Sequence, residues 1–96
     1  MESTIVPLAR LEQIAGQDNL TPSGVHEWLN HFGVFLPSPV YIAMTEKVQN
    51  LRRIFLLLLG NPTLSLLCLE DASLGEKLEE IGSRLGLSDV KERLSQ

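Results

Sequence analysis

Residues 45–69 read TEKVQNLRRIFLLLLGNPTLSLLCL, and this stretch decides the fold class because it holds the longest apolar runs of the chain. Thr45 is a typical helix N-cap and Glu46 suits the positive end of a helix, so we expect a helix over 45–59. One apolar stripe runs along it at helical spacing: Val48, Leu51, Phe55 and Leu58. After Gly60, Asn61 is expected to cap a second helix that begins at Pro62. Its inward-facing residues are predicted to be Leu64, Leu67 and Cys68.

Proline, glycine and capping residues divide the rest of the chain into further short helices. We expect helices over 7–15, 22–31, 73–85 and 88–94. Gly33 is predicted to end the second of these and Gly86 the third. Ser73 and Glu76 form a capping-box pattern, which predicts a helix start at Ser73.

The segment 34–43 differs from the helical parts, because it holds two prolines among β-branched and aromatic residues. It predicts two short extended segments, a minimal β wing. The fold class is therefore mainly α, with five to six short helices in a single small domain over 1–96. Residues 7–69 form a part like a helix-turn-helix, and amphipathic helices follow over 73–96.

Composition excludes several classes of protein. The chain has 96 residues, a net charge of −4 and one cysteine, which cannot form an internal disulfide. The N-terminus carries an acid and no basic region, unlike a secretory signal. The apolar run 54–59 spans about 9 Å as a helix, far less than a ~30 Å bilayer core. We expect a cytoplasmic protein with no membrane partner.

No motif supports catalysis or metal binding. His26 and His31 are five residues apart, so they point about 140° from each other on a helix and cannot share a metal. Cys68 lies in an apolar run typical of a core, whereas a reactive thiol needs an electropositive, exposed position. The glycines are isolated, so no phosphate-binding loop is present. We therefore predict no enzyme, no catalytic residue, no metal, no cofactor and no small-molecule substrate. An enzyme would need His26 or Cys68 in a concave pocket with a strongly shifted pKa.

The pattern Leu20-Thr21, Val25, Trp28, Phe32-Gly33-Val34 and Pro37 resembles the start of mercury-resistance-type regulators, the MerR superfamily. The resemblance covers residues 8–69 and implies a winged helix-turn-helix that binds DNA. In that alternative the side chains facing the major groove are Thr21, Ser23, His26 and Asn30. The residues near phosphate are Lys47, Arg52 and Arg53, gathered with Arg10 on one side.

The charge pattern departs from the DNA-binding members. Residues 22–32 and 34–43 contain no Lys or Arg, although DNA affinity depends on positive charge. The chain is similar in size, charge and pattern to an acidic group in this superfamily that modulates J-protein co-chaperones. That similarity implies binding to a protein partner and inhibiting it.

The run of leucines at 56–59 covers more than one helix face. Surplus exposed apolar area is typical of an interface, while a central helix wrapped by the others is the alternative. We therefore predict a non-enzymatic regulator or adaptor acting by protein–protein contact, with a protein partner or a second copy as a dimer. Acidic rim residues would favour a basic partner. The predicted partner-binding residues are Leu56, Leu57, Leu59 and Phe35.

Overall fold

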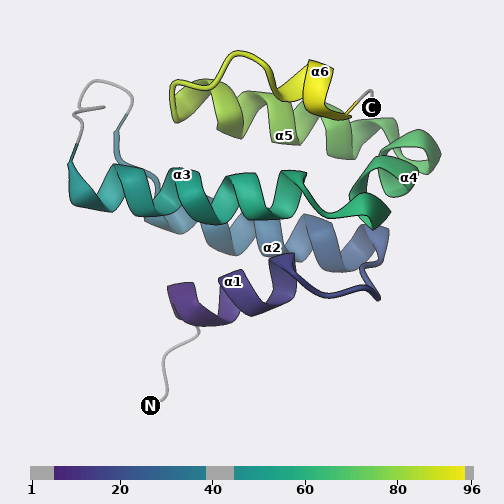
Figure 1. Cartoon of the computed structure of the whole chain (residues 1–96), viewed down its shortest axis with the longest axis horizontal. Helices are drawn as coiled ribbons and strands as arrows, with labels where there is room; N and C mark the ends of the chain where they lie inside the picture. Colours follow the sequence, from purple (N-terminus) through teal and green to yellow (C-terminus); the bar gives the residue numbers. More distant parts are fainter. Residues whose placement is uncertain (1–5, 39–44, 95–96) are drawn as a thin grey trace.

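The computed structural model describes residues 6–38 and 45–94, which form six α-helices and no strand. The helices are α1 (Leu8–Ala15), α2 (Pro22–Phe35), α3 (Glu46–Leu59), α4 (Pro62–Glu70), α5 (Ala72–Arg84) and α6 (Val90–Leu94). In Figure 1, α3 crosses the middle of the molecule, with α1 on one side and α5 and α6 on the other. Helix α2 packs against α1 and α5, and α4 closes one end. The prediction of a small, mainly α domain is confirmed.

Local capping explains where α2 and α3 begin. The hydroxyl of Thr21 accepts a hydrogen bond from the Gly24 N–H at 3.1 Å, and Pro22 supplies the first residue of α2. Thr45 caps α3 in the same way, accepting from the Val48 N–H at 3.3 Å. These starts were predicted, because a cap and its donor lie within three residues of each other.

The predicted end of α2 and the predicted wing are wrong where the structure describes them. Helix α2 continues through Gly33 to Phe35, so Val34 and Phe35 are helical and not extended. A glycine costs a helix about 1 kcal/mol, which packing can offset. The turn away comes at Leu36 (φ −70°, ψ 138°), because Pro37 disfavours a helical residue before it. The remaining wing residues, 39–44, lie outside the described residues.

The predicted capping box at Ser73 is also wrong. Asp71 is the N-cap of α5: its Oδ1 accepts the Ser73 N–H at 3.1 Å, which places Ser73 inside the first turn. Asp is as good a cap as Ser, and it comes two residues earlier. The predicted end at Gly86 is confirmed. Gly86 has φ +82°, and the Leu87 N–H returns to the Gly82 carbonyl at 2.8 Å.

The core joins all six helices around three aromatic rings. Trp28 stacks on Phe32 with centroids 4.7 Å apart, and Phe32 lies 5.8 Å from Phe55 of α3. The surrounding fully buried leucines come from five helices and the turn after α5: Leu11, Leu29, Leu51, Leu58, Leu64, Leu74, Leu78 and Leu85. Most of the leucines are therefore buried in the core.

Asn61 is the buried polar side chain of the described core, 6% exposed between α3 and α4. Its Nδ2 donates to the carbonyls of Ala15 (2.9 Å) and Gln17 (2.6 Å), where α1 ends. Its Oδ1 accepts the Thr63 N–H at 2.9 Å and so caps α4. One amide thus satisfies backbone groups of two helices that are distant in sequence.

Replacing Asn61 with Asp separates these two roles. The carboxylate still accepts the Thr63 N–H, but it donates nothing and faces the carbonyls of Ala15 and Gln17. We expect Asn61→Asp to lower the free energy of unfolding by at least about 2 kcal/mol, measured by urea denaturation. The control Thr45→Asp, at an exposed cap, should be neutral or slightly stabilising. A neutral Asn61→Asp would mean that Asn61 acts as a cap alone.

The glycines of the helices give a second stability prediction. A Cβ on Gly82 would collide with Cγ2 of Val90 and lie 3.3 Å from Cε2 of Phe55. A Cβ on Gly33 or Gly75 meets nothing within 4 Å. We expect Gly82→Ala to destabilise by about 1–3 kcal/mol. Gly33→Ala and Gly75→Ala should stabilise by about 0.4–1 kcal/mol in the same denaturation series. Equal effects at all three sites would contradict the packing of α6 on Gly82.

Candidate functional site

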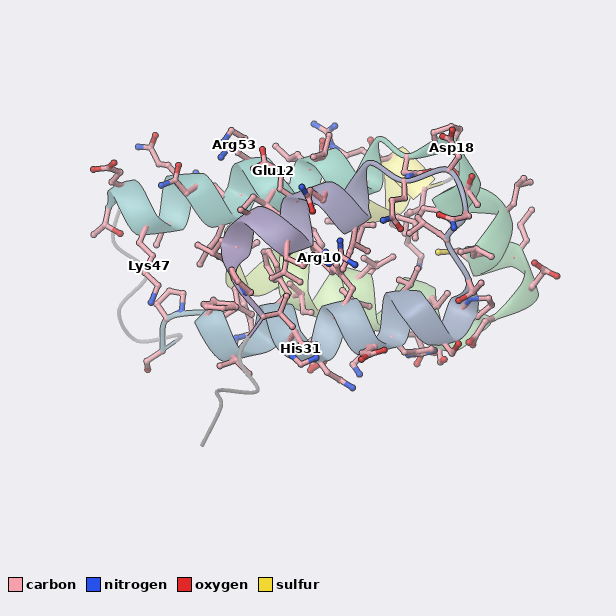
Figure 2. All side chains as sticks on the ribbon, turned by 90° about the horizontal axis from the view of Figure 1, so that it is seen from below. Arg10, Glu12, Asp18, His31, Lys47 and Arg53 are labelled. Atoms are coloured by element: carbon pink, nitrogen blue, oxygen red, sulfur yellow. The ribbon has the colours of Figure 1, made fainter. Side chains whose placement is uncertain are left out.

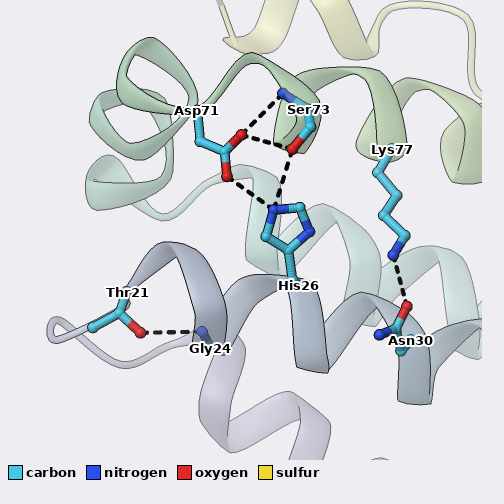
Figure 3. A network of polar contacts seen from close by, with 7 residues as sticks. All are labelled: Thr21, Gly24, His26, Asn30, Asp71, Ser73 and Lys77. Carbon is cyan, nitrogen blue, oxygen red and sulfur yellow. Dashed lines mark hydrogen bonds and ion pairs between the residues drawn. The ribbon is translucent and has the colours of Figure 1, made fainter.

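Two of the residues predicted to read DNA, His26 and Asn30, face the start of α5 (Figure 3). Thr21 is engaged as the helix cap. The imidazole Nε2 of His26 lies 2.9 Å from Oδ2 of Asp71, and Oδ1 of Asn30 accepts a hydrogen bond from Lys77 Nζ at 2.6 Å. The side chain of Ser23 is exposed. The structure therefore engages His26 and Asn30 in the α2–α5 contact, whereas Thr21 caps α2 and Ser23 is exposed.

The cations predicted to lie near phosphate are dispersed and partly engaged. Nε of Arg52 donates to the Leu85 carbonyl at 2.7 Å, at the end of α5. Arg53 instead pairs with Glu12 of α1 at 2.5 Å, and Figure 2 shows this pair on another side from His31 of α2. Lys47 is exposed near the start of α3. Arg10 lines a pocket with Glu27 and His31 of α2. Arg52 and Arg53 are engaged elsewhere, so the predicted cations of the described residues do not form one stripe with α2.

Side chains of serine, histidine and aspartate meet where α2 contacts the start of α5 (Figure 3). Ser73 Oγ donates to Asp71 Oδ1 at 2.6 Å and lies 3.3 Å from His26 Nε2. A nucleophilic triad uses both imidazole nitrogens, one for the carboxylate and one for the hydroxyl. Here Nε2 faces both groups and the serine proton goes to the carboxylate, so no base is placed to take it. The cluster is a helix cap joined to a cross-helix contact.

Cys68 has the environment of a resting thiol. It is half-buried on α4 and packs against the core, so the prediction that it faces inward is partly confirmed. Burial, and then the nearby carboxylate of Asp71, raise the pKa of the Cys68 thiol above its ordinary value of 9.0. Both causes disfavour the thiolate, which is the nucleophilic form.

The two histidines have different partners. His31 Nε2 lies 3.9 Å from Glu27 Oε1 on the exposed side of α2, whereas His26 faces α5. No group of three His, Cys, Asp or Glu side chains able to hold a metal occurs in residues 6–38 and 45–94.

The predicted partner-binding leucines are largely part of the core. Leu59 is 5% exposed, so its assignment to an exposed surface is corrected: α3 turns this side chain toward the other helices. Leu56 and Phe35 are partly buried and pack against the core. Leu57 remains, with 42% of its surface exposed. The alternative of a central helix wrapped by its neighbours describes most of this run.

The larger exposed apolar surface is on α4, and sequence reasoning missed it. Leu66 is 62% exposed and Leu69 is 84% exposed, while Leu64 and Leu67 are buried as predicted. A signal was present in the sequence. Five of the six residues 64–69 are apolar, and a helix on the surface buries one face. If Leu64 and Leu67 face inward, Leu66 and Leu69 face outward.

A groove of about 620 Å³ lies beside this surface, between the end of α4, the first half of α5 and α6. Apolar and small residues line it: Cys68, Leu69, Ala72, Gly75 and Leu94. Its charged walls are Glu76 and Glu79 of α5 and Lys91 of α6. Sequence analysis did not single out this combination, because it depends on how α6 folds back over α5.

Comparisons with known proteins identify no relative of this chain. No protein-family model, no curated protein and no solved structure matches this chain. The likeness to the MerR superfamily therefore stays a hypothesis. No single helix of the described residues has the length and apolar composition to cross a membrane. The pair α3 and α4 passes that test jointly, but it is bent by 73°.

The Asp71 cluster predicts how acid acts on stability. Hydrogen bonds from Ser73, and then from His26, hold the pKa of Asp71 below its ordinary value of 3.8. Above about pH 4 the Asp71 carboxylate is ionised in both the folded and the unfolded chain, and its contribution to the free energy of unfolding is fully present. As the pH falls below about 4, the unfolded chain takes up the proton before the folded chain does, so this contribution is lost. Asp71→Asn keeps a cap, and we expect its free energy of unfolding to fall less steeply below pH 4 than that of the wild type.

The matched control is Asp18→Asn, which removes an exposed carboxylate outside the cluster. Urea denaturation at several values of pH measures all three proteins. If the wild type and Asp71→Asn lose stability in parallel, the carboxylate of Asp71 is not favoured by the fold.

Proposed function

We propose that this protein is a non-enzymatic adaptor or regulator that acts by binding a protein partner. The observation that carries the proposal is the exposure of Leu66 and Leu69 on one short helix. Isolated exposed leucines are ordinary, but two large ones beside an apolar groove are typical of a docking surface. The arrangements of His26 and Cys68 support no reaction, which favours binding over catalysis.

The partner-binding surface of this proposal differs from the one the sequence predicted. It moves from α3 to the outer side of α4, because Leu59 is buried and Leu56 packs against the core. Leu57 remains exposed on α3. The DNA-binding alternative draws less support, since His26 and Asn30 have partners on α5 and the chain is acidic.

The double variant Leu66→Ser, Leu69→Ser tests the surface. Both side chains are exposed, so we expect the fold to be kept with little change in thermal midpoint. Affinity capture from cells with quantitative mass spectrometry should recover specific proteins with the wild type, and their recovery should drop at least about tenfold with the variant. The control Val34→Ser, at a side chain 65% exposed on α2, should capture the same proteins as the wild type.

Two results would contradict the proposal. One is an unchanged set of captured proteins with the double variant. The other is a mass increase in light scattering when mixed-sequence duplex DNA is added at low salt. If this increase is lost by about 200 mM salt, it supports the DNA-binding alternative instead.

A further inference from the structure

The groove beside α4 continues a surface on which the protein already docks one of its own helices. Gly75 and Gly82 are seven residues apart in α5, so they lie on nearly the same side of that helix. At Gly82 the missing side chain makes room for Val90 of α6, which is 2% exposed. At Gly75 the same side of α5 is open, and a Cβ would meet nothing within 4 Å.

The internal packing of the described residues does not require a glycine at position 75. A glycine within a helix costs about 0.5–1 kcal/mol relative to alanine, and at Gly82 the contact with Val90 explains that cost. At Gly75 the result is instead a depression in the groove floor, with Ala72 one turn earlier and Leu69 at its edge. Small residues let a second helix approach closely, as α6 does at Gly82.

The charge around the groove selects the kind of helix. Glu76, Glu79 and Glu80 lie at spacings of three and four on α5, so their carboxylates repel one another. Within the described residues none of the three forms an ion pair. The groove lining holds two of these carboxylates against the single ammonium of Lys91. A basic helix would relieve the repulsion.

We propose that this groove binds an amphipathic, basic helix of the protein partner, an inference that rests on the proposed function. An apolar side chain of that helix fills the space over Gly75 and packs on Leu69 and Leu94. Its Lys or Arg residues pair with Glu76 and Glu79. Helix-in-groove binding of this kind uses apolar anchors at helical spacing. A second copy of this chain fits less well, because each copy carries a net charge of −4.

Two synthetic peptides of about 14 residues, roughly four helical turns, serve as probes. Both carry leucine at positions i, i+3, i+4 and i+7, and the other positions are lysine in one and glutamate in the other. A titration followed by ¹⁵N–¹H correlation spectra should shift the amides of residues 68–79 and 90–94 with the Leu/Lys peptide. The Leu/Glu peptide should leave them unchanged.

Two variants with the same substitution localise the binding. Gly75→Leu places an apolar side chain in the depression, at a position where the Cβ meets nothing within 4 Å, and it should weaken binding of the Leu/Lys peptide at least about tenfold. Gly33→Leu adds the same side chain at an equally open position of α2 and should change the affinity less than about twofold. The double variant Glu76→Gln, Glu79→Gln should weaken binding and flatten its salt dependence.

Four results would overturn the inference. They are shifts located elsewhere, equal binding of the two peptides, no effect of Gly75→Leu, and no binding of either peptide. Spectra of the free protein are first recorded at several concentrations. Amide shifts at the groove that depend on protein concentration would mean that a second copy of this chain occupies the groove. The capture experiment separates this inference from the proposed function. If Leu66→Ser, Leu69→Ser loses the partner but Gly75→Leu keeps it, the adaptor proposal stands and the groove is not its site.

Discussion

The side-chain amide of Asn61 holds the N-terminal half of the fold to the rest at one buried point. It binds the carbonyls of Ala15 and Gln17 where α1 ends, and it caps α4 where the chain bends by 73° after α3. The bend divides one apolar sequence into two helices, so that Leu58 and Leu64 both reach the same core. A straight continuation of α3 would carry the second set of leucines away from the other helices.

Helix α5 packs on α4 and α6 and also on a polar-edged side of α2. His26 and Asn30 meet Asp71 and Lys77 there. Polar residues that face outward on an isolated helix become contacts between helices in the folded chain. This is why two of the residues that the sequence offers for reading DNA, His26 and Asn30, already have partners. The exposed apolar side chains Leu66 and Leu69 lie on α4, directly before the start of α5.

The sequence predicted what depends on a few neighbouring residues. The N-caps Thr21, Thr45 and Asn61 act on donors two or three residues away, and each was found where expected. The glycine stop after α5 is equally local, since only a residue with positive φ completes that turn.

Predictions failed where two local signals competed or where distant contacts decided. Gly33 and Pro37 both favour an end of α2. The helix continues past Gly33 and ends at Phe35, close to Pro37. Asp71 and Ser73 are both good caps, and Asp71 is also hydrogen-bonded to His26, 45 residues away. In the candidate site, the outward faces of Leu66 and Leu69 follow from the helical period. The groove beside them does not, because its far wall is α6.

Two glycines on one side of α5 connect this fold to the proposed function. The cost of Gly82 is offset within the folded chain, because Val90 of α6 packs in the space that the missing side chain leaves. Gly75 leaves an equal space with nothing in it. A helix docked over Gly75 would lie beside α6 and pack on Leu94 as well as on α5. Its binding would therefore stabilise α6, a helix of five residues that packs on α3, α4 and α5. A partner that binds the groove would therefore favour the docked position of α6 by mass action.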